Sequence, residues 1–314
     1  QCCARKSAGI RVDTGLKKDT ELNSNTIAVL CVLICSLCFT AVFASGKYLE
    51  VGDLAMQIMF FRYLSGFVCV LIIHLLFLRH HTNLKTTQLR FHFGRALCGG
   101  LGGGAAIFAA SKMALTDATA IGMLHVVVAI LIGMLIFREK IGLRRAIGIL
   151  LCVVGAYGMI FGKDSFWSGS AQPLVPIIIA FCGAFLVGLE GILIKFLAHR
   201  DGPFVLLFWV NLLGVLIFLP FALWDWTISS HVQKLSFLML GPIALVGQYF
   251  NILGYRLADI SIVSPIDYSW LVFSGLVGFF VFGETINWFE AAAIIIIVFG
   301  GYWLSTEPST PEQK

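Results

Sequence analysis

The sequence predicts an all-α, polytopic membrane protein with ten transmembrane helices arranged as two inverted five-helix repeats. Three observations predict this class: an apolar composition, ten apolar segments of spanning length, and a similarity between the two halves of the chain. Of the 314 residues, 59% are hydrophobic and 12% are charged, whereas soluble domains carry roughly 25% charged residues. Because a soluble fold of this length cannot bury so much apolar surface, we expect the lipid bilayer to surround the chain.

The spans follow from length and hydropathy, since a helix that crosses the hydrocarbon core needs about 20 mostly apolar residues. The predicted spans are 27–47, 56–78, 96–113, 118–137, 143–162, 174–195, 203–223, 235–255, 259–282 and 286–304. Five glycines between positions 99 and 104 lower the helix propensity of the third span. Small residues also let helix backbones approach in lipid, so we expect close packing there.

Lysine and arginine predict the orientation, because cytoplasmic loops hold the excess of these residues. Counted from a cytoplasmic amino terminus, seventeen lie on the cytoplasmic side, Arg95 and Lys195 among them, and four on the other. Arg62 is left within a span. We therefore expect both termini in the cytoplasm of a multi-pass plasma-membrane protein, or in an inner membrane if the host is a Gram-negative bacterium.

The two halves of the chain repeat one another. Matched positions at shifts of 145 and 148 residues include Glu139 with Glu284, Gly155 with Gly300, Tyr157 with Tyr302, Lys47 with Lys195 and Gly66 with Gly214. Five helices is an odd number, so the second copy must enter the membrane from the other side, with a site expected near the midplane between the halves. The predicted organisation is a tail (1–26), a first repeat (27–162), a linker (163–173), a second repeat (174–304) and a second tail (305–314). Glu139 and Glu284 stand at helix ends, where we expect an architectural role.

Several classes of partner are not expected. The basic residues are spread over loops rather than gathered in a patch, which argues against nucleic-acid binding despite the net charge of +5. Cys31, Cys35 and Cys38 share a helix face, but no nearby histidine or carboxylate completes a metal site. The glycines near position 100 lack the βαβ context of a dinucleotide loop. No cofactor or metal is therefore expected.

Three short motifs carry a family resemblance. Phe60-Phe61-Arg62-Tyr63 lies in the second span, Phe137-Arg138-Glu139-Lys140 closes the fourth, and Phe282-Gly283-Glu284 closes the ninth. With the repeat and the span count, these motifs resemble the drug/metabolite transporter superfamily, specifically its EamA-type carriers.

The resemblance implies a cavity lined mainly by helices one, three, four, six, eight and nine, with helices five and ten peripheral. Members of the superfamily move amino acids, nucleotide-like cofactors such as S-adenosylmethionine, riboflavin, sugars and drugs, so the family does not name the substrate. The run Pro265-Ile266-Asp267-Tyr268 is similar to the S-adenosylmethionine and riboflavin branches, except that the acidic Asp267 departs from their pattern.

Asp267 is the sharpest candidate for the substrate site. An ionised side chain at the centre of a spanning helix costs about 2.5–3.5 kcal/mol, so it is expected to face protein or a wet cavity. Pro265 removes a backbone hydrogen bond just before Asp267 and predicts a broken helix. Asp267 is therefore predicted to bind a cationic substrate group or a coupling proton. The alternative is that Asp267 pairs with a neighbouring basic or polar group and only stabilises helix packing.

Three other ionisable residues fall within spans. Glu190 is a candidate gate or proton relay; the alternative is that its side chain extends to the membrane interface or pairs with Lys195. Arg62 is a candidate to bind an anionic group of the substrate; the alternative is that it anchors neighbouring helices to each other. His125 is a candidate to bind the substrate or to transfer a proton; the alternative is a residue that only packs between helices.

Amides and aromatic rings complete the predicted substrate-binding set. Gln248 and Asn251 stand one turn apart in the eighth span, where they supply hydrogen-bonding groups. Tyr268 and Trp270 are candidates to stack on a flat ligand.

The sequence predicts a secondary transporter of a small organic metabolite, amino-acid-like or nucleoside- and cofactor-like, that works by alternating access and is driven by exchange or a proton gradient. The alternative is a membrane-embedded enzyme acting on a lipid or small metabolite, although no HExxH or GxSxG motif occurs. The expected partners are the substrate and the lipid bilayer. Proton coupling and a homodimer remain open.

Overall fold

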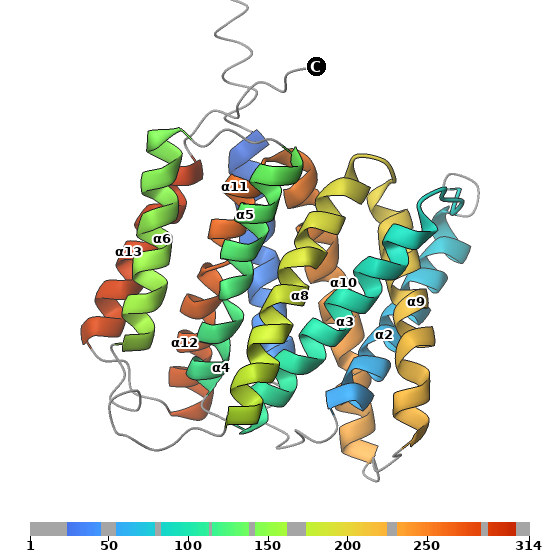
Figure 1. Cartoon of the computed structure of the whole chain (residues 1–314). Coiled ribbons are helices and arrows are strands. Elements are labelled where there is room, and N and C mark those ends of the chain that lie inside the picture. Colours follow the sequence, from blue (N-terminus) through green and yellow to red (C-terminus); the bar gives the residue numbers. More distant parts are fainter. Residues whose placement is uncertain are drawn as a thin grey trace, which may run out of the picture.

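The computed structural model is a bundle of membrane-length helices (Figure 1). It describes residues 24–44, 55–78, 83–112, 115–137, 142–161, 174–224, 231–283 and 288–305, and none of these forms a strand. The bundle begins with the Ser24–Ala44 helix. The following helices are α2 (Ala55–Ile73, ending in a wider π turn, η2, His74–Leu78), α3 (Leu89–Lys112), α4 (Leu115–Gly122), α5 (Leu124–Phe137), α6 (Leu143–Phe161), α8 (Leu174–Ala198), α9 (Pro203–Trp224), α10 (His231–Leu257), α11 (Ile260–Ile266), α12 (Ser269–Phe282) and α13 (Trp288–Ser305).

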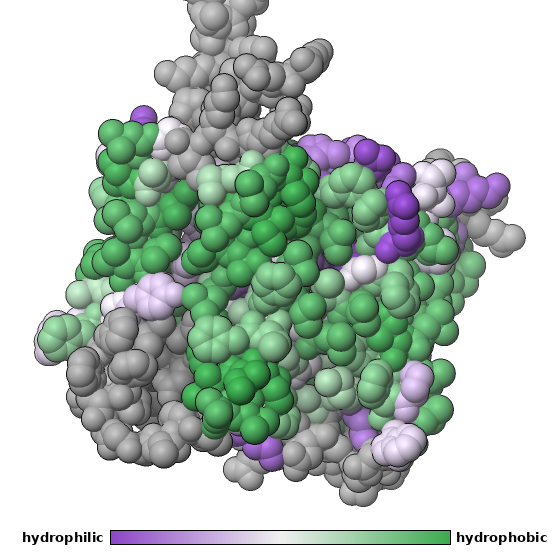
Figure 2. All heavy atoms as spheres, in the orientation of Figure 1, coloured by the Kyte–Doolittle hydropathy of each residue, from purple (hydrophilic) through white to green (hydrophobic). Residues whose placement is uncertain are grey.

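The helices are long and apolar enough for a multi-pass membrane protein. Within the described part of the chain, seven helical segments meet the length and hydropathy of a membrane span, and shorter apolar helices accompany them. Large apolar side chains such as Leu135, Phe280 and Ile295 lie on the outside of the bundle, which suits contact with lipid rather than water. Figure 2 shows this apolar surface over most of the visible face, with hydrophilic residues gathered toward its rim.

Most predicted spans agree with the observed helices to within a few residues. The clearest difference is the third span, which was predicted from residue 96 and begins at Leu89 in α3. The charged and polar residues before position 96 lower the hydropathy of that first turn, although they belong to the helix. As a result Arg95 lies inside the helix, where it is fully buried.

The fourth and ninth spans are each broken near the middle. The first break falls at Met123, between α4 and α5, and the second at Asp267 and Tyr268, between α11 and α12. Pro265 lies in the last turn of α11, and Asp267 and Tyr268 keep helical backbone angles but donate to carbonyl oxygens three residues before them, so the break predicted near Asp267 is present as a tightened turn between α11 and α12. The 145-residue shift places Met123 on Tyr268, so the two breaks occupy matched positions.

Matched helices pack against each other at both sides of the bundle. Helix α6 packs against α13 at one side, and α2 against α9 at the other, while α3 and α8 cross between them (Figure 1). Between α3 and α8 the backbones come close, since a Cβ at Gly102 would lie 2.7 Å from Val187 Cγ2 and 3.1 Å from the carbonyl oxygen of Gly183. The close packing predicted for the glycine-rich segment is confirmed.

The contacts between matched helices are reciprocal. A Cβ at Gly155 would lie 2.7 Å from Ile297 Cγ1, and a Cβ at Gly300 would lie 2.8 Å from Cys152 Sγ. The 145-residue shift carries Gly155 to Gly300 and Cys152 to Ile297, so the same contact is made twice with the partners exchanged. Such exchange is the pattern of two like surfaces that meet about a two-fold axis.

The same reciprocity recurs between α2 and α9 at the 148-residue shift. A Cβ at Gly66 would lie 2.5 Å from Asn211 Oδ1, and a Cβ at Gly214 would lie 2.5 Å from the ring of Tyr63. Tyr63 corresponds to Asn211 and Gly66 to Gly214.

Candidate substrate cavity

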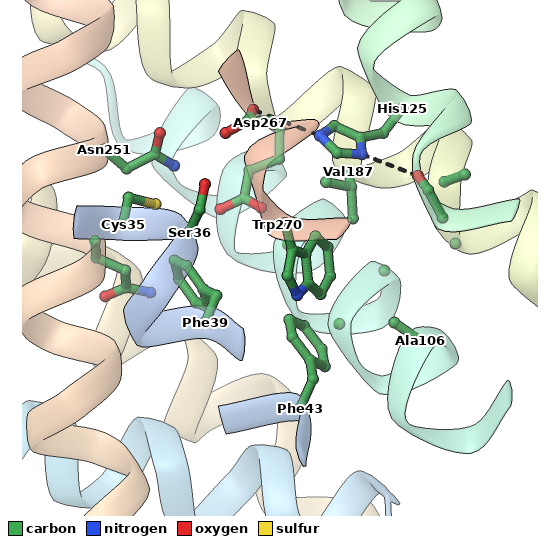
Figure 3. A pocket seen from close by; sticks show the side chains of 18 of the residues that line it. Cys35, Ser36, Phe39, Phe43, Ala106, His125, Val187, Asn251, Asp267 and Trp270 are labelled. Atoms are coloured by element: carbon green, nitrogen blue, oxygen red, sulfur yellow. Dashed lines mark hydrogen bonds and ion pairs between the residues drawn. The ribbon is translucent and has the colours of Figure 1, made fainter. Parts of the chain in front are cut away.

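A cavity of about 120 Å³ lies between the helices, where the two broken spans face the Ser24–Ala44 helix, α3, α8 and α10 (Figure 3). None of the described side chains of α6, α9 and α13 lines the cavity, whereas α2 contributes Arg62 and Tyr63. The lining implied by the family resemblance is therefore correct, with helix two added to it. About 10–15 Å³ suffices for one water molecule, so this cavity has room for several waters or part of an organic ligand.

Seven of the eight predicted substrate-site residues line this one cavity: Arg62, His125, Glu190, Gln248, Asn251, Asp267 and Trp270. Tyr268 does not. Its side chain is 1% exposed and packs in the hydrophobic core, because the turn between α11 and α12 directs Asp267 and Trp270 to the cavity and Tyr268 away from it.

His125 and Asp267 join the two breaks across the cavity (Figure 3). Nε2 of His125 lies 3.5 Å from Oδ2 of Asp267, and Nδ1 of His125 lies 2.9 Å from the carbonyl oxygen of Gly122, at the end of α4. A carbonyl oxygen only accepts, so Nδ1 carries a proton. Attraction between Nε2 and Oδ2 then requires one further proton, either on the ring or on the carboxyl group.

Arg95 and Glu190 form the second charged pair of the cavity. Nε of Arg95 lies 3.8 Å from Oε1 of Glu190, and Nη1 of Arg95 donates to the carbonyl oxygen of Leu206 at 3.4 Å. The Arg95 side chain is buried, while that of Glu190 is 19% exposed toward the cavity. A Cβ at Gly99 would collide with the Glu190 carboxylate, so only glycine lets this carboxylate lie against α3.

Two basic residues assigned to cytoplasmic loops from the sequence lie elsewhere. Arg95 is buried at the cavity, as described above. Lys195 is buried in α8, where its Nζ donates to the carbonyl oxygen of Ala258 at 2.6 Å. Glu190 therefore pairs with Arg95 rather than with Lys195. Arg95 lies near the start of α3 and Lys195 near the end of α8, and a hydropathy pattern does not separate a loop from a buried terminal turn. The excess of basic residues on one side of the membrane remains when these two are left out.

Arg62 has a different environment from Arg95. Its guanidinium lies over the rings of Phe39, at 5.4 Å, and Tyr63, at 5.0 Å. Nη1 points to Met59 Sδ at 3.8 Å, and buried Nε has no hydrogen-bond partner. No carboxylate within the described ranges forms an ion pair with it.

Amides and aromatic rings occupy the other walls. Nδ2 of Asn211 donates to Oε1 of Gln248 at 3.3 Å, which fixes that amide, whereas buried Oδ1 of Asn251 has no partner. The rings of Phe43 and Trp270 lie 4.7 Å apart (Figure 3). The cavity thus combines charged, amide and aromatic walls.

Some lining residues were not predicted. Arg95 was missed because it was assigned to a loop. Cys35, Ser36, Phe39 and Phe43 come from the first helix, and uncharged residues of this kind carry no sequence signal that separates a cavity wall from ordinary packing. The remaining Glu139 and Glu284, the linker 163–173 and most of both tails lie outside the described residues.

Curated relatives match most of the chain. An uncharacterized transporter of Helicobacter pylori is 25% identical over 93% of this chain and 99% of its own length. A pseudopaline exporter of Pseudomonas aeruginosa is 24% identical over 86% of this chain and 93% of its own. A riboflavin transporter of Vibrio cholerae is 29% identical over 51% of this chain and 53% of its own.

The fold is also found among solved structures. One crystal structure superposes with a TM-score of 0.69 at 15% identity, covering 90% of this chain and 95% of that chain. The sequence profile of the EamA-like transporter family matches twice, at residues 26–161 and 174–306. With its apolar helices and its transporter relatives, the chain belongs to the EamA-like transporter family and is a multi-pass membrane transporter.

Proposed function

We propose that this protein is a secondary transporter that carries a small organic metabolite through the central cavity by alternating access. The observation that carries the proposal is the convergence of Arg62, Arg95, His125, Glu190 and Asp267 on that cavity. Ionisable side chains inside spanning helices are costly and mark substrate or ion pathways.

The repeat supports a role in binding rather than in packing. At the matched shifts, Arg62 corresponds to Val210, His125 to Trp270, and Glu190 to Val42. Asp267 corresponds to Gly122. Each position is therefore filled by an uncharged residue in the other half, so the helix packing that the halves share does not itself require the charge.

We propose that the two halves, 27–162 and 174–304, are inverted repeats that rock against each other around the cavity. The reciprocal contacts Gly155–Ile297 and Gly300–Cys152 support a two-fold relation, and five spans per half would place that axis in the membrane plane. The excess of Lys and Arg on one side supports cytoplasmic termini in a plasma membrane.

The coupling site proposed here is the pair of His125 and Asp267. Because the contact needs one proton beyond that on Nδ1, gain or loss of this proton changes the attraction between the two breaks. A proton gradient could in this way be linked to movement of α5 against α11 and α12. Substrate exchange without a proton is the competing energy source.

The candidate substrates are amino-acid-like compounds and nucleoside- or cofactor-like compounds such as riboflavin or S-adenosylmethionine. The names of the relatives support small metabolites as a class, since one is a riboflavin transporter and another a pseudopaline exporter. A membrane-embedded enzyme is the alternative. The direction of net transport by a secondary carrier follows from the gradients of substrate and coupling ion across its membrane.

The test is counterflow in vesicles that contain the purified protein. Vesicles loaded with unlabelled riboflavin, S-adenosylmethionine or mixed amino acids are diluted into the labelled compound, with and without an imposed pH gradient. A carrier gives saturable uptake of a compound recovered unchanged by mass spectrometry. Protein-free vesicles are the control, and a product of altered mass without counterflow would identify an enzyme instead.

A further inference from the structure

Arg62 is a buried cation with which no described carboxylate forms an ion pair. Its side chain is 7% exposed, and its contacts are the Met59 sulfur and the faces of Phe39 and Tyr63. Rings attract a guanidinium, but they accept no in-plane hydrogen bond from it, and buried Nε of Arg62 has no partner, as is also true of buried Nε of Arg95. Removing a charge from water without a full partner is strongly unfavourable.

The Arg, His, Asp and Glu side chains that line the cavity, apart from Arg62, all form ion pairs. Arg95 pairs with Glu190, and His125 with Asp267. Within the described lining, Arg62 is therefore the cation that forms no ion pair. A ligand that brings one negative group would satisfy this guanidinium, which binds carboxylate and phosphate oxygens through paired N–H donors.

The body of such a ligand meets a strip of aromatic rings. Phe39, which lies under the Arg62 guanidinium, has its ring 6.3 Å from that of Phe43. Phe43 in turn lies 4.7 Å from Trp270. The three rings run from the arginine toward the turn that holds Asp267, and all three line the cavity (Figure 3).

A packing role alone does not explain the arginine. The matched position in the other half is Val210, which is fully buried in the same α2–α9 contact region. The helix pair therefore accommodates an aliphatic side chain at this place. An arginine that served as a helix anchor would also be expected to donate to backbone carbonyl oxygens, whereas the contacts of Arg62 among the described residues are with the side chains of Met59, Tyr63 and Phe39.

We propose that the transported compound carries one anionic group, a carboxylate or a phosphate, that binds Arg62, and a flat apolar body that lies along Phe39, Phe43 and Trp270. This inference rests on the proposed transport through the cavity and narrows its substrate class. An amide acceptor, Oδ1 of Asn251, remains for a hydrogen-bond donor of the same compound.

The experiment measures binding to the purified full-length protein with a set of near-isosteric probes. These are phenylacetate as the carboxylate, phenyl phosphate as the phosphate, phenylacetamide as the neutral form and phenethylamine as the cation. Each is followed by equilibrium dialysis and by the shift in melting temperature, since a ligand that binds only the folded state raises it. We expect the two anions to bind at least about tenfold more tightly than the amide, because a hydrogen bond to a charged group is worth about 1.5–3 kcal/mol.

Arg62→Gln and Arg62→Lys test the assignment, with Arg90→Gln as the matched control, because Arg90 is an exposed arginine of α3 that lies over Phe91. Arg62→Gln is expected to abolish the preference for anions, and Arg62→Lys to keep part of it. Without ligand, Arg62→Gln is expected to melt at the same or a higher temperature, because it removes an unmatched buried charge. Arg90→Gln is expected to keep the preference.

Two outcomes overturn the inference: equal binding of amide and anions by the unchanged protein, or an anion preference that persists in Arg62→Gln. A lower melting temperature for Arg62→Gln together with an unchanged preference identifies a helix anchor. If Arg62→Gln does not fold, Arg62→Lys decides, since a guanidinium that binds an anion must lose affinity on replacement by an ammonium. The stronger of the two anionic probes assigns the head group.

These results separate the inference from the proposed function. Anion binding through Arg62 with no counterflow of any compound contradicts transport and leaves the anion site standing. Counterflow of a cation or neutral compound that is unaffected by Arg62→Gln leaves transport standing and overturns the anion site.

Discussion

His125 and Asp267 lie on different halves of the chain, and their side chains meet 3.5 Å apart at the breaks of the fourth and ninth spans. The histidine is fixed by the carbonyl oxygen of Gly122, so under the proposed coupling the proton shared with Asp267 is the part of the contact that changes. This geometry makes specific predictions for transport.

Asp267→Asn is expected to lower the transport rate by about tenfold or more and to flatten its dependence on pH, because an amide cannot take up the shared proton. The measurement is initial counterflow rate in vesicles across a range of pH. Asp259→Asn, just before α11, is the control for the same chemical change outside the cavity. A normal rate and a normal pH profile in Asp267→Asn would contradict the proposed role.

The effects of His125→Asn and Asp267→Asn are expected to be strongly non-additive. Residues in contact have interaction energies of about 0.5–3 kcal/mol in a double-mutant cycle, so the double variant should be little worse than either single one. The cycle is measured on transport rate and on melting temperature. Purely additive losses would show that the two groups act independently.

Gly99→Ala is expected to destabilise the protein by about 1–3 kcal/mol, because the added methyl group displaces the Glu190 carboxylate toward the cavity. Transport should fall as well. Gly94→Ala in the same helix is the matched control, since its Cβ meets Leu193 Cδ1 at an ordinary 3.5 Å. Unfolding in denaturant checks the stability difference, and equal stability of the two variants would remove Gly99 from the account of the site.

Gly155→Ala and Gly300→Ala are expected to destabilise the α6–α13 contact by similar amounts, about 1–3 kcal/mol each, because the two contacts are reciprocal. Substrate affinity should change little, since neither helix lines the cavity. Gly158→Ala, whose Cβ would lie 3.6 Å from Ala293 Cβ, is the control. A large effect at one position and none at the other would argue against the two-fold relation.

The spans could be predicted because a membrane helix is recognised by the length of its apolar segment. Much of the candidate site could be predicted because ionisable residues inside such segments are rare. Asp267 stands beside Pro265 in an apolar segment, so both the break and the candidate site were visible. The break at Met123 was not, because no proline marks it. The ion pairs depend on tertiary packing. Glu190 pairs with Arg95 rather than with Lys195 because of which helical turns face each other, and a hydropathy pattern does not contain that information.

The glycines with reciprocal contacts and the charged residues of the cavity are two separate sets of positions. Gly155 with Gly300, and Gly66 with Gly214, determine how the halves fit together, while Arg62 and Asp267 each occur in one half only. Under the roles proposed for Arg62 and Asp267, the transported compound can change through a substitution in a single half, without a compensating change at the matched position of the other half. Proteins that share this architecture can in this way differ in the compound that they transport.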